Sequence, residues 1–441
     1  RYKKGNPTIE QLLNQTSGIK EVDPYLEVCD IHWRDYIRHS MLVNIITNID
    51  ELNFTPGEYF YYTNANYILL ASIIEKVSKM SFEDYLQKNL FEPLNMKHTI
   101  LNIDVFRIIP NRAIGYTEDE GQIYKTHLYG LYFAGDGQII TNPEDMFQWH
   151  QNIKNSTIGT PAIWKKMCTK AKLNDGTIIN FGLGVEFETH NGYKAMGFDG
   201  MIKSGFVSKY LYFAELDIAF FTTQNTFDWD FTERFFQLVD LYIQPKITSN
   251  IKTTKQTYKA IILKTRELKQ YEGKYLFFNN ENHQEREIKL YNDKLFYQTF
   301  EGEKIGELIP VGNHEFVYLE DKDSQSRIQF EFNQDEKQFS FDNRDGDNPK
   351  LFKAFVPYEH SNKELFDYVG TYYNKDLQIA KEIKVDNGVL MFYYRNGAWK
   401  TEITSISKDL FNTQQAEIQF VRNNKGKITR CIIMGLNFEK K

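Results

Sequence analysis

A five-residue pattern occurs twice in the second half of the chain and restricts what that half can fold into. Tyr-x-Gly-x-Tyr begins at Tyr271 and again at Tyr368, 97 residues later. A leucine precedes each copy by three residues, at Leu268 and Leu365. Self-similarity at a fixed offset is the signature of a duplicated structural unit. We therefore predict two copies of one unit, each about 80–90 residues long.

The hydrophobic pattern around both copies has a period of two, which is typical of β-strands with one buried face. The alternation is clearest at residues 328–332, at residues 339–341 and on both sides of the turn Asp386-Asn387-Gly388. Asn-Gly between alternating segments is a strong hairpin signal. A barrel or sandwich would close the edges of such strands. We predict antiparallel β-barrel-like domains at residues 263–356 and 361–441.

The first half of the chain mixes helical periodicity with strands. Residues 64–79 carry apolar side chains at nearly every turn, which predicts a deeply buried helix. A capping box at Thr141–Glu144 predicts the start of another helix. Further helices are expected at 11–13, 146–153 and 231–242, and strands at 210–214 and 217–223.

These elements predict an α+β domain, an antiparallel sheet with helices, over residues 1–245. Residues 245–258 are rich in Lys, Thr, Ser and Asn and contain few large apolar side chains. Such composition is typical of connecting segments. We therefore place a linker at residues 246–262.

Charge and cysteine content exclude several classes of function. The formal net charge is −6, so no basic surplus favours nucleic acid as a partner. Cys29, Cys168 and Cys431 lie far apart and give neither a disulfide framework nor zinc spacing. The longest apolar run, Tyr67–Ile74, is well below the roughly 18 residues of a transmembrane helix. No phosphate-binding, dinucleotide-binding or metalloprotease motif is present, so we expect no metal and no cofactor.

Five segments of the first half share the order and spacing of motifs in one enzyme superfamily. They are Thr8–Gly18, Pro56–Tyr67, Phe91–Thr99, Gly135–Trp149 and Gly197–Phe206. Through them, residues 7–245 resemble the serine β-lactamase and DD-peptidase superfamily, in its class C and esterase-like branch (peptidase S12-like). The resemblance implies acyl transfer to water from an ester, amide or peptide, so the expected partner is a small-molecule or peptide substrate.

The superfamily acts through three motifs, of which the second is Tyr-x-Asn. Tyr62-Thr63-Asn64 matches it within the second of the five segments. The resemblance implies that Tyr62 is the general base and that Asn64 orients the substrate. This chemistry requires a phenol whose pKa is held well below its usual value near 10 by neighbouring cations.

The first motif is Ser-x-x-Lys at a helix start, where the serine is the nucleophile. The chain contains three such strings, beginning at Ser17, Ser249 and Ser405. Ser17 falls where the superfamily has a turn, Ser249 in the linker and Ser405 in a β repeat. We interpret all three as chance matches and none as a nucleophile.

The third motif is Lys-Thr-Gly or His-x-Gly on a strand, which supplies a hydrogen-bond donor beside the tyrosine. Alignment on Gly205 places Phe198, Asp199 and Gly200 at this motif, with Phe198 in the histidine position. A phenyl ring cannot donate a hydrogen bond or carry charge. Lys203-Ser204-Gly205 is the alternative match, and Lys203 could still reach the pocket. We predict residues 198–200 and Lys203 as substrate-binding.

Two interpretations of the missing nucleophile remain open. In the first, the sequence lacks an N-terminal portion that carries Ser-x-x-Lys, and the chain as written is inactive. Without that portion, a helix-sized apolar groove and a sheet edge would face water, which favours this interpretation. In the second, the chain is a catalytically dead, penicillin-binding-like protein that binds a ligand or partner. The Phe198 substitution favours the second interpretation.

The two C-terminal repeats resemble the lipocalin-like β domains that follow the hydrolase in some relatives. There they are thought to shape the active-site cleft or to mediate assembly. A third hypothesis makes these repeats the functional part, as a carbohydrate- or protein-binding module. The resemblance also implies a periplasmic or extracellular protein, whereas the sequence leaves the oligomeric state open.

Overall fold

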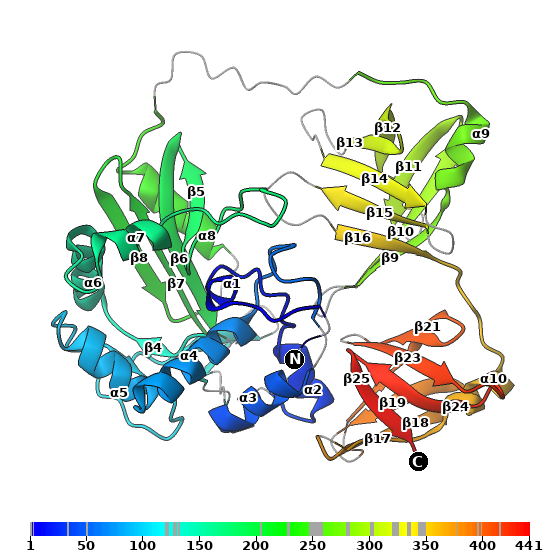
Figure 1. Cartoon of the computed structure of the whole chain (residues 1–441), viewed down its shortest axis with the longest axis horizontal. Helices are drawn as coiled ribbons and strands as arrows, with labels where there is room; N and C mark the ends of the chain where they lie inside the picture. The colour runs from blue at the N-terminus through cyan, green and yellow to red at the C-terminus, as the bar shows by residue number, and fades with distance from the viewer. Residues whose placement is uncertain are drawn as a thin grey trace. The chain divides into compact units, whose positions relative to one another are not determined.

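The fold is seen in a computed structural model of residues 1–441 (Figure 1). The structure describes residues 2, 4–32, 35–49, 52–119, 123–126, 130, 133–202, 205–226, 230–246, 259–278, 283–299, 304–319, 326–332, 337–342, 350–375, 377–394, 397, 399–413 and 416–441. The chain divides into two compact units. The first comprises Arg1–Val22 with Ile31–Ser249, and the second comprises Asp23–Asp30 with Asn250–Lys441.

The first unit is an α+β domain. Its helices are α1 (Ile9–Leu13), α3 (His39–Asn48), α4 (Asn64–Ser78), α5 (Phe82–Leu86), the π-helix η1 (Gln87–Phe91), α6 (Pro143–Asn155), α7 (Pro161–Met167) and α8 (Phe231–Asp240). Its strands are β1 (Ile100–Leu101), β2 (Tyr116–Asp119), β3 (Ile123–Thr126), β4 (Ile139–Ile140), β5 (Glu186–His190), β6 (Tyr193–Ile202), β7 (Phe206–Phe213) and β8 (Ile218–Gln224).

The helix that begins at the Tyr-x-Asn motif has clear start and stop signals. The hydroxyl of Thr63 accepts a hydrogen bond from the backbone N–H of Ala65 at 3.1 Å and so caps α4. Lys79 ends the helix in the left-handed conformation. The predicted helix at 64–79 is therefore confirmed. The prediction that it is deeply buried is wrong, because Val77 is 78% exposed and the buried residues of α4 are only Ala65, Asn66, Ile68 and Ala71.

The N-terminus of α6 corrects one sequence-based expectation. The cap is Asn142 rather than Thr141, because the Asn142 side chain accepts from the N–H of Asp145 at 2.9 Å. Pro143 then occupies the first turn, where its missing N–H costs no hydrogen bond. The helix cap thus lies one residue after the predicted Thr141.

Four antiparallel strands in the order β5-β6-β7-β8 form the main sheet of the first unit. Helix α8 packs on one face, where Phe235 and Val239 join Leu211, Phe213 and Phe220 in a buried cluster. On the opposite face, the Tyr210 hydroxyl lies 2.8 Å from His150 Nδ1 in α6. Helices thus cover both faces of the sheet.

The second unit contains two β domains that follow one another in the chain. The first consists of α9 (Thr265–Leu268), the 3-10 helix η2 (Lys269–Tyr271), β9 (Gly273–Phe278), β10 (His283–Tyr291), β11 (Lys294–Thr299), β12 (Lys304–Gly312), β13 (Glu315–Leu319), β14 (Ser326–Phe332), β15 (Lys337–Asp342) and β16 (Lys350–Phe355). These eight strands form a closed antiparallel barrel, in which β16 pairs with β9.

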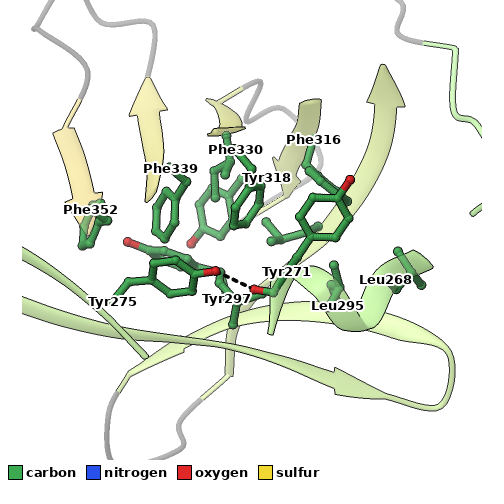
Figure 2. Close-up of a cluster of buried hydrophobic side chains, with 13 residues drawn as sticks. Leu268, Tyr271, Tyr275, Leu295, Tyr297, Phe316, Tyr318, Phe330, Phe339 and Phe352 are labelled. Atoms are coloured by element: carbon green, nitrogen blue, oxygen red, sulfur yellow. Dashed lines mark hydrogen bonds between the residues drawn. The ribbon is translucent and has the colours of Figure 1, made fainter. Parts of the chain in front are cut away.

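Aromatic side chains fill the interior of this barrel, as Figure 2 shows. The buried set comprises Tyr271, Tyr275, Tyr297, Phe316, Tyr318, Phe330, Phe339 and Phe352. The rings of Phe339 and Phe352 stack at 4.7 Å with an interplanar angle of 12°. The described part of the lumen is therefore a packed core, and it gives no support to ligand binding inside the barrel.

The second β domain begins with α10 (Asn362–Tyr368). Its strands are β17 (Gly370–Asn374), β18 (Ile379–Asp386), β19 (Val389–Tyr394), β20 (Trp399–Glu402), β21 (Thr404–Ser407), β22 (Leu410–Asn412), β23 (Glu417–Arg422), β24 (Ile428–Ile433) and β25 (Leu436–Lys440). They form a nine-stranded antiparallel sheet in the order β20-β19-β18-β17-β25-β24-β23-β22-β21. The end strands β20 and β21 are consecutive in the chain, so the sheet is nearly a barrel.

The Tyr-x-Gly-x-Tyr repeat has the same local structure in both β domains. The hydroxyl of Tyr275 donates to the carbonyl of Tyr271 at 2.8 Å, and that of Tyr372 donates to the carbonyl of Tyr368 at 2.7 Å. Each pattern thus ties the start of a strand to the helix before it. The predicted α+β domain followed by two antiparallel barrel-like units is confirmed.

Replacing Tyr275 or Tyr372 with Phe is expected to destabilise the mutated β domain by about 1–2 kcal/mol. The ring packing stays, but a buried carbonyl loses its donor. Backbone amide exchange should become about tenfold faster in that domain and stay unchanged in the other. Tyr373→Phe is the matched control, because the ring of Tyr373 lies 3.8 Å from the ammonium group of Lys441 rather than in the core. Equal exchange in all variants would contradict the proposed role of the hydroxyl.

The short helix α2 (Asp23–Val28) belongs to the second unit although its sequence lies within the first predicted domain. The hydroxyl of Tyr25 donates to the carbonyl of Met434 at 2.5 Å, in the turn between β24 and β25. Asp30 forms an ion pair with Lys381 of β18. The boundaries 1–245, 263–356 and 361–441 stay predictions, and most of the predicted linker lies outside the described residues.

No helix within the described residues is long and apolar enough to cross a membrane.

Candidate active site

The Tyr-x-Asn motif lies at the end of a loop that leads into α4. This loop is held by backbone hydrogen bonds to the turn that contains Ser17. The N–H groups of Gly57 and Tyr61 donate to the carbonyls of Thr16 and Gln15 at 2.7 and 2.8 Å. Gly18 is required in this turn, because its φ is +75° and a Cβ there would lie 2.4 Å from the Phe54 carbonyl oxygen. The two segments therefore form one rigid support for Tyr62.

A buried polar network lies beneath the motif. Gln15 Oε1 accepts from the N–H of Thr63 at 3.1 Å and from Asn66 Nδ2 at 2.6 Å. The hydroxyl of Ser17 donates to Asn66 Oδ1 at 2.6 Å. Gln15, Ser17 and Asn66 are all fully buried. Ser17 is therefore a structural residue and not an accessible nucleophile.

The two other Ser-x-x-Lys strings offer no nucleophile at this site within the described residues. Ser405 lies in β21 of the second β domain, where its hydroxyl donates to the carbonyl of Tyr358 at 2.7 Å. Ser249 lies outside the described residues.

Asn64 is the first residue of α4 and is held through its backbone. Its N–H donates to Glu21 Oε2 at 2.7 Å, and the other carboxylate oxygen of Glu21 accepts from the N–H of Val22 at 2.6 Å. Glu21 is 3% exposed. A buried carboxylate at a helix N-terminus satisfies a free N–H group and interacts favourably with the helix dipole. Glu21 therefore fixes the backbone from which the Asn64 side chain projects.

The structure brings Tyr62 and Phe198 together. Their ring centroids are 6.2 Å apart with an interplanar angle of 27°. Phe198 also meets Phe181 edge to face at 6.1 Å, and Phe181 packs against Phe60 at 5.3 Å. Tyr62 itself is 41% exposed. These four rings form an aromatic wall, and the Tyr62 ring at its end reaches solvent.

Strand pairing separates the predicted third-motif residues onto two faces. Phe198 pairs with Tyr210 of β7, on the face that meets α6. Asp199 pairs with Lys209, whose ammonium group lies over the rings of α8 on the other face. Because successive side chains in a strand alternate, Asp199 points away from Phe198. Lys203 lies outside the described residues, and both Asp199 and Lys203 remain predictions as substrate-binding groups.

The electrostatic surroundings of Tyr62 differ from those that the chemistry requires. Partial burial of the Tyr62 phenol raises its pKa above the usual range, and the carboxylates of Glu21 and Asp136 raise it further. Glu186 and Asp199 act in the same direction. The described residues therefore favour a neutral phenol near pH 7, whereas the sequence-based expectation was a pKa lowered by cations.

Besides the Tyr62 phenol, a carboxyl group near the site has a raised pKa. Burial and the charge of Asp199 raise the pKa of Glu186 in β5, and the ammonium group of Lys209 opposes this rise. Lys209 is 8% exposed and lies 3.1 Å from Glu188. The described residues contain no group of three metal-binding side chains.

Sequence reasoning missed Glu21, Gln15, Asn66 and Phe181 as parts of this site. Gln15 and Asn66 lie inside two of the matched segments, so their position close to the motif could have been inferred. Glu21 lies just outside them, and the pairing of its carboxylate with Asn64 depends on a contact 43 residues apart. No local pattern carries that information.

The first half of the chain matches a known family. Residues 1–241 match the beta-lactamase family, and this chain belongs to that family. The match covers more than half of the chain and places it in the serine β-lactamase and DD-peptidase superfamily.

Curated relatives and a solved structure resemble about half of the chain. D-aminopeptidases of Brucella canis and Brucella suis are 24% identical over 203 residues, which is 46% of this chain and 39% of theirs. The match thus spans well under half the length of these relatives. A penicillin-binding protein from Bacillus halodurans is 24% identical, with a TM-score of 0.46 over 53% of this chain and 73% of that one.

Proposed function

We propose that residues 1–245 form most of a serine hydrolase domain that transfers the acyl group of an amide or peptide to water. The observation that supports this proposal best is the stacking of Tyr62 on Phe198. It joins the start of α4 to β6, the two elements that carry the second and third motifs in the superfamily. Tyr62 would serve as general base and Asn64 as the group that orients the substrate.

The substrate class that we propose is D-amino acid amides and short peptides with a free amino end. The Brucella relatives carry the name D-aminopeptidase, and this name suggests the substrate class. Carboxylates of Glu21, Asp136, Glu186 and Asp199 act on the Tyr62 phenol, so the local potential is negative. A negative potential favours a substrate that carries an ammonium group.

We propose that the nucleophilic serine and its lysine belong to a segment upstream of Arg1. Three features of the described residues support this. A cavity of about 290 Å³ beside α4 is lined mainly by apolar side chains, among them Leu12, Ile19, Leu69 and Ile73. No described strand pairs with the outer edge of β8. Gln15 Nε2 is buried without a hydrogen-bond partner among the described residues.

A second candidate function is ligand binding without catalysis. It is favoured by Phe198 at the position of the histidine and by the raised pKa of the Tyr62 phenol. A site without a donor beside Tyr62 would bind an acyl compound but turn it over slowly. We propose a periplasmic or extracellular location in either case, on the resemblance alone.

Assays of D- and L-amino acid amides test the proposal. Residues 1–441 should hydrolyse neither, whereas the gene product that includes the residues upstream of Arg1 should release ammonia from the D-amides only. Sequencing upstream of Arg1 should show an in-frame Ser-x-x-Lys. Hydrolysis by residues 1–441 that survives Tyr62→Phe would contradict the site assignment. An active longer protein that prefers L-amides would contradict the substrate class alone.

A further inference from the structure

The two β domains carry a cationic side chain at the same position of the duplicated fold. In the first β domain, Arg286 of β10 lies directly opposite Tyr275 of β9. In the second, Lys381 of β18 lies directly opposite Tyr372 of β17. Both tyrosines are the last residue of the repeated Tyr-x-Gly-x-Tyr pattern. Arg286 and Lys381 are therefore equivalent residues of the two copies.

The surroundings of the two cations also match. The residue two positions further along each strand is a buried isoleucine, and side chains two residues apart in a strand point to the same face. Both cations therefore point inward. The guanidinium group of Arg286 lies 5.7 Å from the centroid of the Tyr297 ring, and the ammonium group of Lys381 lies 5.9 Å from that of Phe392. Each ring lies directly opposite the buried isoleucine of its own domain.

In the second β domain, a carboxylate neutralises the cation. Lys381 is fully buried, and its ammonium group pairs with the carboxylate of Asp30. Burial of a lysine ammonium group is costly unless such a partner compensates it. Asp30 ends the short segment 23–30, which belongs to the second unit but lies far from the β domain in sequence. This domain thus receives its carboxylate from a separate segment that docks on it.

In the first β domain, the equivalent cation lacks such a partner. No acidic side chain among the described residues forms an ion pair with Arg286, which is partly buried. Its Nη1 donates to the carbonyl of Glu285 at 2.8 Å, and its Nε is buried without a hydrogen-bond partner. The guanidinium group also acts on the Tyr297 phenol, because burial raises the pKa of Tyr297 to about 12 and Arg286 opposes this rise. A carbonyl and a neutral phenol leave the charge of Arg286 uncompensated.

We propose that Arg286 binds the carboxylate group of a ligand, in the way that Lys381 binds Asp30 in the second β domain. A guanidinium group offers a planar fork of N–H donors that fits a carboxylate. Tyr297 belongs to the packed core of the barrel (Figure 2), so the ligand would rest against that core and not within it.

The rings beside Arg286 indicate what carries the carboxylate. Tyr297 contacts Tyr318 at 5.3 Å and stacks on Phe341 at 5.6 Å. Such rings favour a carboxylate attached to an apolar or aromatic body. The carboxylate can come from a small organic acid or from an acidic side chain of a peptide. The proposal is independent of the proposed hydrolase function.

Titration of residues 1–441 with two carboxylate probes tests the proposal and separates the two sources. Phenylacetate represents a small organic acid, and the capped peptide of residues 23–30 represents an acidic protein segment. Calorimetry should detect binding of at least one probe. Phenylacetamide, and the same peptide with Asn and Gln in place of its acidic residues, are the neutral controls. Each should bind at least tenfold more weakly than its charged counterpart.

Three variants test whether Arg286 is the binding group. Arg286→Met should weaken binding of the probe at least tenfold. Arg286→Lys recreates the cation of the second β domain and should keep the affinity within about threefold, which guards against a folding defect in the Met variant. Arg327→Met is the matched control in the same barrel, because Arg327 already pairs with Glu315 at 3.4 Å. It should leave the affinity unchanged, and amide exchange in β9–β16 checks the fold of every variant.

The outcomes are distinct. Binding of phenylacetate alone would identify an organic acid as the source of the carboxylate, and binding of the peptide alone would identify a protein segment. Binding of neither probe would overturn the proposal. Equal binding of charged and neutral probes, or an affinity that Arg286→Met leaves unchanged, would overturn it as well.

Discussion

Replacing Phe339 with Ala is expected to destabilise the first β domain by about 3–5 kcal/mol and to leave it largely unfolded. Phe339 is fully buried. Its ring stacks on Phe352 at 4.7 Å and meets Tyr275 and Phe330 at 4.8 and 5.2 Å. Truncation removes these contacts and opens a cavity that rings from four strands cannot collapse to fill. This is the largest stability effect that we expect for a single substitution in the chain.

Amide exchange in β9–β16 measures this loss of stability. In the Phe339→Ala protein it should become at least a hundredfold faster. Leu351→Ala is the control on the neighbouring strand β16. Leu351 is 42% exposed, so its truncation should change exchange less than threefold. Amides of β17–β25 should stay protected in both variants. A Phe339→Ala protein with native exchange rates would show that the aromatic core is not what stabilises the barrel.

Replacing Tyr62 with Phe is expected to lower kcat by about 10²- to 10⁴-fold in the gene product that carries the nucleophile. General-base catalysis contributes rate factors of this size. The substituted ring can still stack on Phe198, so KM should change less than threefold. The split between kcat and KM separates loss of a proton acceptor from loss of packing.

The hydrolysis rate of the same enzyme should change with pH in a defined direction. A phenol acts as a base only when ionised, so the rate should rise with pH through the phenol pKa. Burial and the carboxylates of Glu21 and Asp136 raise that pKa, whereas the lysine of the proposed upstream segment would lower it, so the midpoint of the rise reports which effect is larger. Tyr59→Phe, in the same loop, should leave both kcat and the profile unchanged. A Tyr62→Phe enzyme within tenfold of native kcat would contradict the general-base role.

The fold was predictable where the hydrophobic pattern of the sequence has a clear helical or strand period. Helix α4 and the β hairpin at Asp386–Gly388 follow from local patterns, because apolar side chains recur at the period of the element. The duplicated tyrosine pattern predicted two similar β domains, and both use the same tyrosine-to-carbonyl bond. The displaced cap at Asn142 was missed because Thr and Asn are both good caps, and the turn geometry decides between them.

The candidate site was predictable only in part. Tyr62, Asn64 and Phe198 came from motif spacing, and the structure places Tyr62 against Phe198. The opposite orientation of Asp199 follows from strand register, which a single sequence does not fix. The raised pKa of Tyr62 depends on carboxylates that come from separate segments. Pairings between distant segments, such as Lys381 with Asp30, leave no trace in local sequence.

The membership of residues 23–30 in the second unit has a consequence for how the protein is made. Asp30 and Lys381 are 351 residues apart, so a ribosome that adds about 5–20 residues per second separates their synthesis by roughly 20–70 s. During that interval the apolar residues Tyr25, Leu26 and Val28 have no docking surface. The first unit can complete its own fold early, but the segment beside Glu21 must wait for the last domain to emerge. Nascent chains stalled before residue 381 should therefore expose this segment to chaperones and proteases.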